Sequence, residues 1–159
     1  MDQMQRLITR WTEHGIAVPS GVSPADISAF ESNADGVLPN DLRHYFAKVN
    51  GMGERGTVDD DFFSFWQLSD VESLAQYVPD RAHRVQNASR YIIVADHSIG
   101  LPSFAVKLPD KSDDLAPVAS IFTDGGAIEL EHRFDSFADF LRSYLDNPIE
   151  TSATLPRCA

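Results

Sequence analysis

Apolar residues recur with the period of an α-helix at both ends of the chain, and this pattern constrains the fold most. Near the N-terminus, positions i, i+3, i+4 and i+7 are occupied by Met4, Leu7, Ile8 and Trp11. Near the C-terminus the same spacing is filled by Phe137, Phe140, Leu141, Tyr144 and Leu145. We predict helices over residues 2–14 and from a capping Ser136 to a stop at Asn147 and Pro148. The fold must therefore bury a helix face contributed by each end of the chain.

Two more helices are predicted in the first third of the chain. One opens at Ser23, which is placed to cap it, and Pro24 suits the first helical position because its ring fixes φ. The other opens at residues 38–41 and ends at Asn50 and Gly51, since both residue types tolerate the left-handed conformation of a helix stop. The N-terminal third is thus predicted to be mainly helical.

The middle of the chain has the residue patterns of strands. Strand-like runs occupy residues 62–68, 91–95, 104–108, 118–122 and 127–134. The second run is continuously apolar, which indicates a central strand. After the first run, Ser69 and Glu72 stand at capping-box spacing and predict a short helix. The pattern predicts an α+β fold, with a mostly antiparallel sheet flanked by N-terminal helices and a C-terminal helix.

Length and composition set the predicted domain boundary. A chain of 159 residues, of which 43% are hydrophobic, fits a single domain with one core. We expect residues 1–147 to form that domain and residues 148–159 to be a loose tail. Within the domain, residues 52–61 and 109–117 have the composition of exposed acidic loops.

The chain is strongly acidic, with 24 Asp and Glu against 13 Lys and Arg and a net charge of −11. Residues 56–80 hold six acids and no base, and residues 109–159 hold ten acids and four bases. Such a field repels phosphate backbones and anionic lipid, so nucleic acid and membrane surfaces are not expected partners, whereas a basic protein is attracted. The alternative is that the acidity serves solubility alone.

The N-terminus and cysteine content bear on the compartment. A single cysteine, Cys158, cannot form an internal disulfide. The first residues are not basic, no apolar run follows them, and no stretch approaches the length of a membrane span. We expect a cytoplasmic protein.

Motifs for catalysis or ligand binding are weak. Residues 51–56 spell G-x-G-x-x-G, but they follow a predicted helix and lead into an acidic run that would repel a pyrophosphate. The acidic runs 59–61 and 110–114 lack the spacing of a calcium loop. Residues 96–98 are Asp-His-Ser, yet sequence neighbours cannot form a catalytic triad by adjacency alone. We expect no catalytic centre, metal or cofactor; a hydrolase using His97 is the third hypothesis.

Three stretches together resemble a known family. The first has Phe30-Glu31, then Leu38-Pro39 opening a helix and Asn50-Gly51 closing it. The second is the aromatic run that ends in Trp66-Gln67-Leu68, and the third is Tyr91-Ile92-Ile93-Val94-Ala95-Asp96 with Gly100 and the last helix. The combination is similar to the SUKH superfamily, in its Smi/Knr-type branch, over residues 3–147. One departure is the segment 96–100, where the family more often has a glycine-richer turn.

The resemblance implies a non-catalytic protein-binding domain with helices packed on a mostly antiparallel sheet. Bacterial members are commonly immunity proteins that neutralise polymorphic or contact-delivered toxins, often nucleases, in the cytoplasm. Fungal relatives act as regulatory scaffolds, and a scaffold without a toxin partner is the alternative. If the acidic segments converge, they form a surface that binds a basic toxin. The residues of this surface would be Asp59, Asp60, Asp61, Asp110, Asp113, Asp114, Glu129 and Glu131. Trp66 would be an aromatic anchor if exposed, although its size favours the core.

Overall fold

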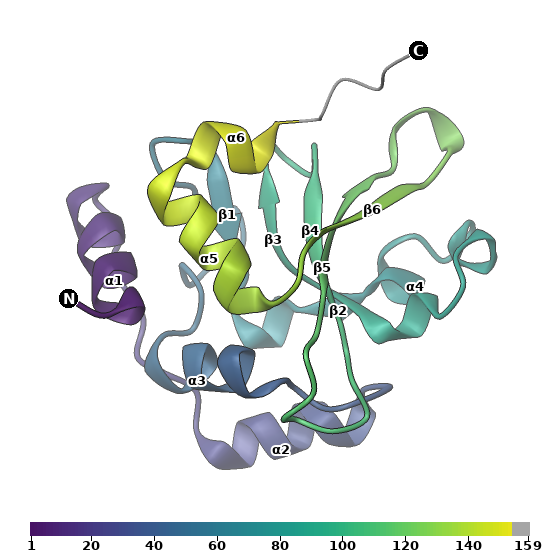
Figure 1. The fold of residues 1–159 in the computed structure, drawn as a ribbon, viewed down its shortest axis with the longest axis horizontal. Helices are drawn as coiled ribbons and strands as arrows, with labels where there is room; N and C mark the ends of the chain where they lie inside the picture. The colour runs from purple at the N-terminus through teal and green to yellow at the C-terminus, as the bar shows by residue number, and fades with distance from the viewer. Residues whose placement is uncertain (154–159) are drawn as a thin grey trace.

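The computed structural model describes residues 1–153. At its centre is an antiparallel sheet in the order β1-β3-β4-β5-β6, with β2 also paired to β3 (Figure 1). The strands are β1 (Phe63–Phe65), β2 (Glu72–Ser73), β3 (Tyr91–His97), β4 (Ser103–Lys107), β5 (Val118–Phe122) and β6 (Glu129–Phe134). The α-helices are α1 (Gln3–Glu13), α2 (Pro24–Asn33), α3 (Asn40–Lys48), α4 (Leu74–Tyr77), α5 (Phe137–Asp146) and α6 (Pro148–Ser152). The predicted α+β class and antiparallel sheet are confirmed.

The strand register defines two ends of the sheet. We call the end where β3 finishes at His97 and β4 begins at Ser103 the upper end, because it is uppermost in Figure 1. The lower end holds Tyr91 and Lys107, which pair with each other. The upper end carries the connections that contain residues 59–62, 98–102 and 123–128, and the lower end carries residues 108–117.

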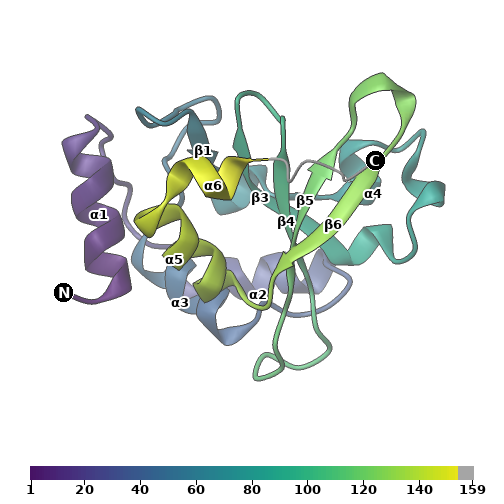
Figure 2. The same cartoon turned by 45° about the horizontal axis from the view of Figure 1, so that its top comes forward.

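One face of the sheet carries an aromatic core. Phe140 of α5 packs its ring 5.8 Å from Phe65 and 4.8 Å from Phe104. One turn later, Tyr144 lies 4.9 Å from the rings of both Phe63 and Phe65. Helices α1 and α3 both contact α5 on this side of the molecule (Figure 2). The helical faces from the two ends of the chain therefore meet over the sheet, as their periodicity requires.

The predicted helix starts are confirmed in α2 and α5. The Ser23 hydroxyl accepts a hydrogen bond from the amide of Asp26, and the Ser136 hydroxyl accepts one from the amide of Asp139. These contacts satisfy amide groups that the first turn of a helix leaves unpaired. Both Asp residues also lie in the first turn, where the helix dipole favours negative charge.

The short helix predicted from Ser69 is wrong in position. Residues Leu68–Asp70 form a 3₁₀ turn, and the capping box is built four residues later, by Ser73 and Gln76 at the start of α4. Glu72 is instead part of β2 and pairs with Ile93 of the central strand. Pairing with β3 thus delays the helix to the second serine with the right spacing.

The chain does not become a loose tail at Pro148. Residues 148–152 form α6, which packs on α5. The Thr151 side chain is fully buried and exchanges a 2.6 Å hydrogen bond with Ser143 of α5, while the Thr151 carbonyl accepts from Arg133 of β6. The rest of the predicted tail, residues 154–159, lies outside the described residues.

Candidate functional site

Asp59, expected in an exposed loop, has its side chain buried inside the domain. One carboxylate oxygen accepts hydrogen bonds from the amides of Asp61, at 2.9 Å, and Phe63, at 3.0 Å. The other accepts a hydrogen bond from the hydroxyl of Tyr144 in α5. A buried carboxylate is stable only when its oxygens are paired, and these three donors provide the pairing.

The Tyr144 hydroxyl is the centre of this network. It donates to Asp59 and accepts from Nε1 of Trp11 at 3.1 Å and from Nε of Arg10 at 3.0 Å. Burial and the adjacent carboxylate raise the pKa of Tyr144 well above its usual range. Burial lowers the pKa of Arg10, but its contacts with Tyr144, Asp59 and Asp61 outweigh this and raise it, so Arg10 stays charged.

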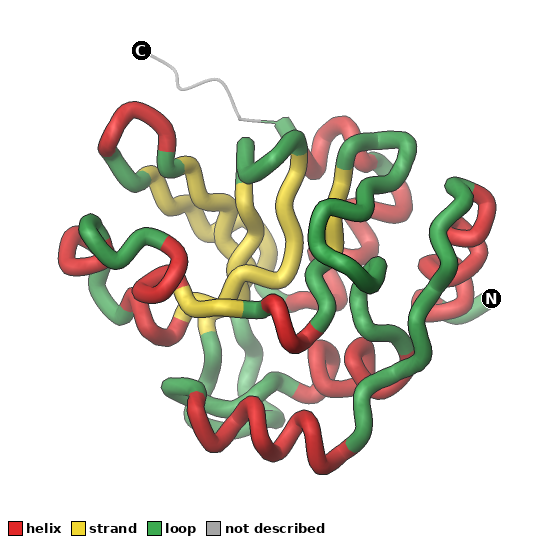
Figure 3. The backbone as a smooth tube through the Cα atoms, turned by 180° about the vertical axis from the view of Figure 1, so that it is seen from behind, coloured by secondary structure: helices red, strands yellow, loops and turns green. Residues whose placement is uncertain are grey.

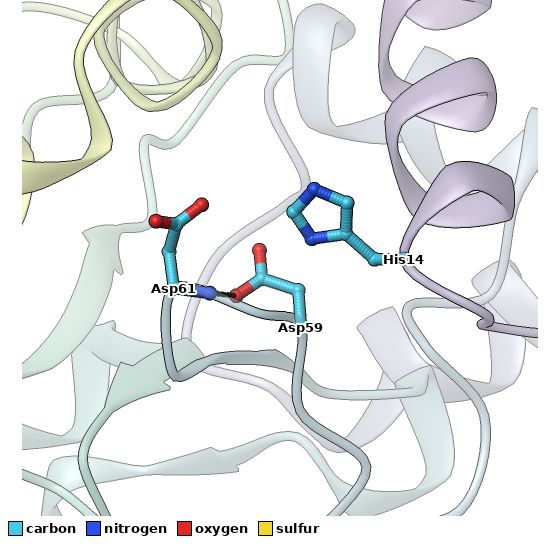
Figure 4. A group of neighbouring side chains, drawn as sticks. All are labelled: His14, Asp59 and Asp61. Atoms are coloured by element: carbon cyan, nitrogen blue, oxygen red, sulfur yellow. Dashed lines mark hydrogen bonds between the residues drawn. The ribbon is translucent and has the colours of Figure 1, made fainter.

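Figure 4 shows His14, Asp59 and Asp61 together, with ligand atoms within 4.8 Å of one another. The atoms that could bind a metal ion already have partners within the protein. His14 Nδ1 accepts the amide of Asp60 at 3.0 Å, and Arg10 forms an ion pair with Asp61. A guanidinium at this position supplies the positive charge that a metal ion would bring. We therefore interpret the cluster as a structural contact that holds residues 59–61 against α1 and α5.

The other members of the acidic triplet face solvent to different degrees. Asp60 has a side chain that is 76% exposed, and its nearest basic group is His14, 3.9 Å away. Asp61 is partly exposed and forms an ion pair with Arg10. Within the triplet, Asp60 is the carboxylate most available to a partner.

The second acidic segment lies at the opposite end of the sheet. Asp110 is hydrogen-bonded to Arg90 at 2.5 Å, at the lower end, and Asp113 and Asp114 are exposed in the same loop. The amide of Asn40, at the start of α3, donates to the carbonyl of Ser112 at 2.8 Å, which holds this loop beside α3. These carboxylates are therefore separated from Asp60 by the length of the sheet.

Glu129 and Glu131 occupy a third place. Both are exposed on β6, which forms one edge of the sheet, whereas β1 with the acidic triplet forms the other. The eight acidic residues do not converge on one face, because the topology distributes them over both ends and both edges. The single acidic surface predicted from the sequence required these residues to converge, and they do not.

Two other candidates are packed within the domain. Trp66 is buried, its Nε1 donates to Asp96 at 2.8 Å, and the guanidinium of Arg55 lies 4.2 Å above its ring. The expectation that Trp66 belongs to the core is confirmed. His97, the candidate catalytic residue, packs its ring 4.9 Å from Phe63.

An apolar surface that sequence reasoning missed lies at the upper end. Phe62 is 62% exposed and Ile99 is 95% exposed, and Leu101 is also exposed. The amide of Ser98 donates to the carbonyl of Phe62 at 3.0 Å, so the β3–β4 turn lies against the residue that precedes β1. Figure 3 shows the backbone from behind, with the connecting loops in green. We call Phe62, Ile99 and Leu101 the apolar tip. The sequence signal for this surface was the segment 96–100, where the family more often has a glycine-richer turn.

A groove runs along α2 on another part of the molecule. Two adjacent hollows of about 440 and 470 Å³ share Phe30, Asn33 and Val71 in their walls. Both lie between α2 and the segment that contains β2. The walls of the groove combine apolar side chains, such as Phe30 and Val71, with polar ones, such as Asn33.

The residues of the Leu-Pro to Asn-Gly motif form hydrogen bonds between neighbouring elements. The Glu31 carboxylate accepts the amide of Leu38 at 2.9 Å and binds the guanidinium of Arg43. The Asn50 side chain accepts the amide of Leu68 at 2.7 Å. The motif therefore joins α2 to α3 and the end of α3 to the segment after β1.

Comparison with known proteins identifies the family. No curated protein matches the chain. No helix within residues 1–153 is long and apolar enough to cross a membrane. The family model described as SMI1 / KNR4 family (SUKH-1) matches residues 21–143, which include the Leu-Pro to Asn-Gly motif, the whole sheet and most of α5. The resemblance noted in the sequence is confirmed: this chain belongs to the SMI1/KNR4 family, SUKH-1.

Proposed function

We propose that this protein is a non-catalytic immunity protein that neutralises a cognate toxin in the cytoplasm by stoichiometric binding. Its membership of the SUKH-1 family carries the proposal, because immunity proteins are common among the family's bacterial members. The net charge of −11 supports a basic partner. Binding that covers the toxin's working surface requires no reaction chemistry from this chain.

The upper end of the sheet is the proposed contact surface. The segments 56–64 and 96–104 meet there and hold four Asp residues without any Lys or Arg. Asp60 and Asp61 present their carboxylates at the edge of this surface, where Arg10 forms an ion pair with Asp61 and His14 lies 3.9 Å from Asp60. A rim of this sign complements a surface built to grip phosphate, as in a nuclease toxin.

The remaining acidic residues have a different proposed role. Asp110, Asp113 and Asp114 lie at the lower end, and Glu129 and Glu131 lie on β6, at the opposite edge of the sheet from β1. A charge nevertheless acts through the field of the whole molecule. At physiological salt the field extends about 8 Å beyond each charge before screening dominates. We propose that these residues steer a basic toxin toward the domain without contacting it in the complex.

The immunity hypothesis predicts a toxin gene directly beside the gene for this protein, and the experiment uses the product of that gene. Co-expression of the two proteins is expected to restore growth, and a 1:1 complex should be isolable whose association rate falls as salt rises. Asp60→Asn should slow association several-fold, whereas Asp113→Asn in the lower loop should change it less. A complex with salt-independent association would contradict the acidic contact, and the absence of both rescue and complex would contradict immunity itself.

The groove along α2 favours a second candidate function. A regulatory scaffold would hold a segment of another protein, and the two adjacent hollows beside Phe30 and Val71 are the proposed place for it. In that case, Phe30→Ala should abolish partner binding while Asp60→Asn leaves it unchanged. The immunity hypothesis predicts instead that Phe30→Ala leaves binding unchanged and that Asp60→Asn slows association.

A further inference from the structure

We propose that the apolar tip, Phe62, Ile99 and Leu101, is the anchor that inserts into an apolar pocket on the basic toxin. This inference rests on the proposed function and names the part of the surface that holds the complex together. Interfaces depend on a few large side chains at their centre, surrounded by a polar rim. The tip has that composition, because its three apolar side chains are exposed and Asp60 and Asp61 directly precede Phe62 in the chain.

The backbone at the tip is unfavourable for the residues it carries. Phe62 has φ of 67° and Ile99 has φ of 61°, in the left-handed region that glycine and asparagine occupy readily. For a β-branched residue such as isoleucine this conformation is a genuine outlier. Because the Ile99 side chain is 95% exposed, packing within the domain does not compensate for the strain. A contact outside the domain accounts for an isoleucine at this position.

The strained turn is held in place by its own hydrogen bonds. The amide of Leu101 donates to the carbonyl of His97 at 2.8 Å, and the amide of His97 donates to the carbonyl of Pro102 at 2.9 Å. The Ser98 amide fixes the turn to Phe62. The three apolar side chains are thus presented on a backbone that is ordered before binding, which reduces the entropy lost on association.

Charge decides which occupant the tip accepts. Two copies of this domain meeting tip to tip would bring two acidic rims together, and like charges in an interface oppose association. A basic protein with an apolar pocket satisfies both parts of the surface. We therefore assign the tip to the toxin and not to a second copy of this chain.

Rim and tip are expected to act on different rate constants. Exposed charges govern mainly how fast two proteins meet, whereas buried apolar contacts govern how slowly they separate. Asp60→Asn should therefore lower the association rate and its salt dependence. Ile99→Gly and Phe62→Gly should each raise the dissociation rate at least tenfold with little change in association.

The test measures binding of the adjacent-gene toxin to the full chain by surface plasmon resonance, with thermal unfolding of each free variant alongside. Glycine fits the backbone at both positions, so Ile99→Gly should unfold at the same or a higher temperature than the wild type while binding more weakly. Leu115→Ala is the matched control, because Leu115 is 77% exposed at the lower end of the sheet. It should leave both rate constants unchanged.

The outcomes separate the two proposals. If the wild type binds the toxin and the tip variants bind equally well, the anchor is overturned and the proposed function stands. If the wild type neither binds the toxin nor protects against it, the proposed function fails and the anchor fails with it. If sedimentation shows a wild-type dimer that Ile99→Gly converts to a monomer, the tip serves a second copy and the assignment is overturned.

Discussion

At the scale of single residues, two buried tyrosine hydroxyls have opposite surroundings. Tyr144 has three hydrogen-bond partners: Arg10 and Trp11 of α1, and Asp59 of the loop before β1. The Tyr45 hydroxyl is also buried but has no hydrogen-bond partner among the residues the structure describes. Burying a hydroxyl without a partner costs free energy, whereas removing one that has partners leaves those partners unsatisfied.

Replacing each tyrosine by phenylalanine should therefore give opposite results. Tyr144→Phe removes a donor to the buried Asp59 and is expected to lower the free energy of unfolding by about 2 kcal/mol or more at pH 8. Tyr45→Phe removes an unpaired hydroxyl and should leave that free energy unchanged or raise it. Urea unfolding of both variants measures the difference, and equal losses would contradict the network.

The same hydroxyls predict a loss of stability in alkali. Burial raises the pKa of Tyr45 and of Tyr144 above the value of 10.0 for an exposed tyrosine. Above about pH 10 the unfolded chain therefore releases protons that the folded chain retains, and the free energy of unfolding falls as pH rises. Each such group contributes a slope of up to about 1.4 kcal/mol per pH unit. Urea unfolding between pH 9 and 11 should show a shallower decline for Tyr45→Phe than for the wild type.

α3 ends at Lys48 with Val49 extended as its C-cap, not at Asn50 and Gly51 as predicted, and Gly51 lies further on, where no side chain fits. Its φ is +57°, and a Cβ there would lie 2.5 Å from the backbone of Trp66. Gly51→Ala is expected to lower the free energy of unfolding by about 3 kcal/mol or more, because strain and overlap add. Gly15→Ala is the control: its φ is +78° with nothing within 4 Å of the Cβ, so it should cost only about 1 kcal/mol. Thermal or urea unfolding of both variants tests the comparison.

At the scale of elements, the helices differ in how firmly they are attached. α5 buries Phe137, Phe140, Leu141 and Tyr144, whereas the buried residue of α2 is Ile27. An element with few buried contacts opens locally without unfolding the whole domain. α2 should therefore lose hydrogen-exchange protection before α5.

Removing the two serine caps tests this difference. Ser136→Ala should lower the global free energy of unfolding by about 1 kcal/mol, because α5 is part of the common core. Ser23→Ala should speed exchange of the α2 amides while changing global stability much less. Hydrogen exchange followed by mass spectrometry separates the two results, and equal global losses would show that α2 unfolds only with the whole domain.

Local patterns were sufficient to predict the helices and most of the strands. Met4, Leu7 and Trp11 are buried at the predicted spacing in α1, and β5 has the predicted bounds. The short helix was misplaced because Ser69 and Ser73 both have an acid or amide three residues later. Only the pairing of residues 72 and 73 with β3 distinguishes them, and that contact is not local.

At the scale of the whole molecule, the candidate site depends on topology. Nothing local distinguishes Asp59 from Asp60, yet one is buried beneath α1 and α5 and the other faces solvent. The order of strands places residues 110–114 at the lower end, away from the acidic triplet. The sequence showed how much charge each segment carries, but the end of the sheet on which it lies follows from strand pairing.

The domain is predicted to extend beyond residue 147. α6 contributes the buried Thr151, and the carbonyls of Glu150 and Thr151 accept hydrogen bonds from Arg133. A chain ending at residue 147 should lose about 2 kcal/mol relative to one ending at residue 153, because these groups lose their partners. Urea unfolding of the two truncated chains measures the loss, and identical midpoints would place the boundary at residue 147.

The contact between α1 and α5 at Tyr144 has a consequence for synthesis. The ribosome makes α1 first, but Trp11 and Arg10 wait for a hydroxyl encoded more than a hundred codons later. The nascent chain cannot complete its interior until that last turn has emerged, and the loop that precedes β1 stays unfastened until then. The hydrogen-bond network around Asp59 therefore forms only in a chain that has been synthesised beyond Tyr144.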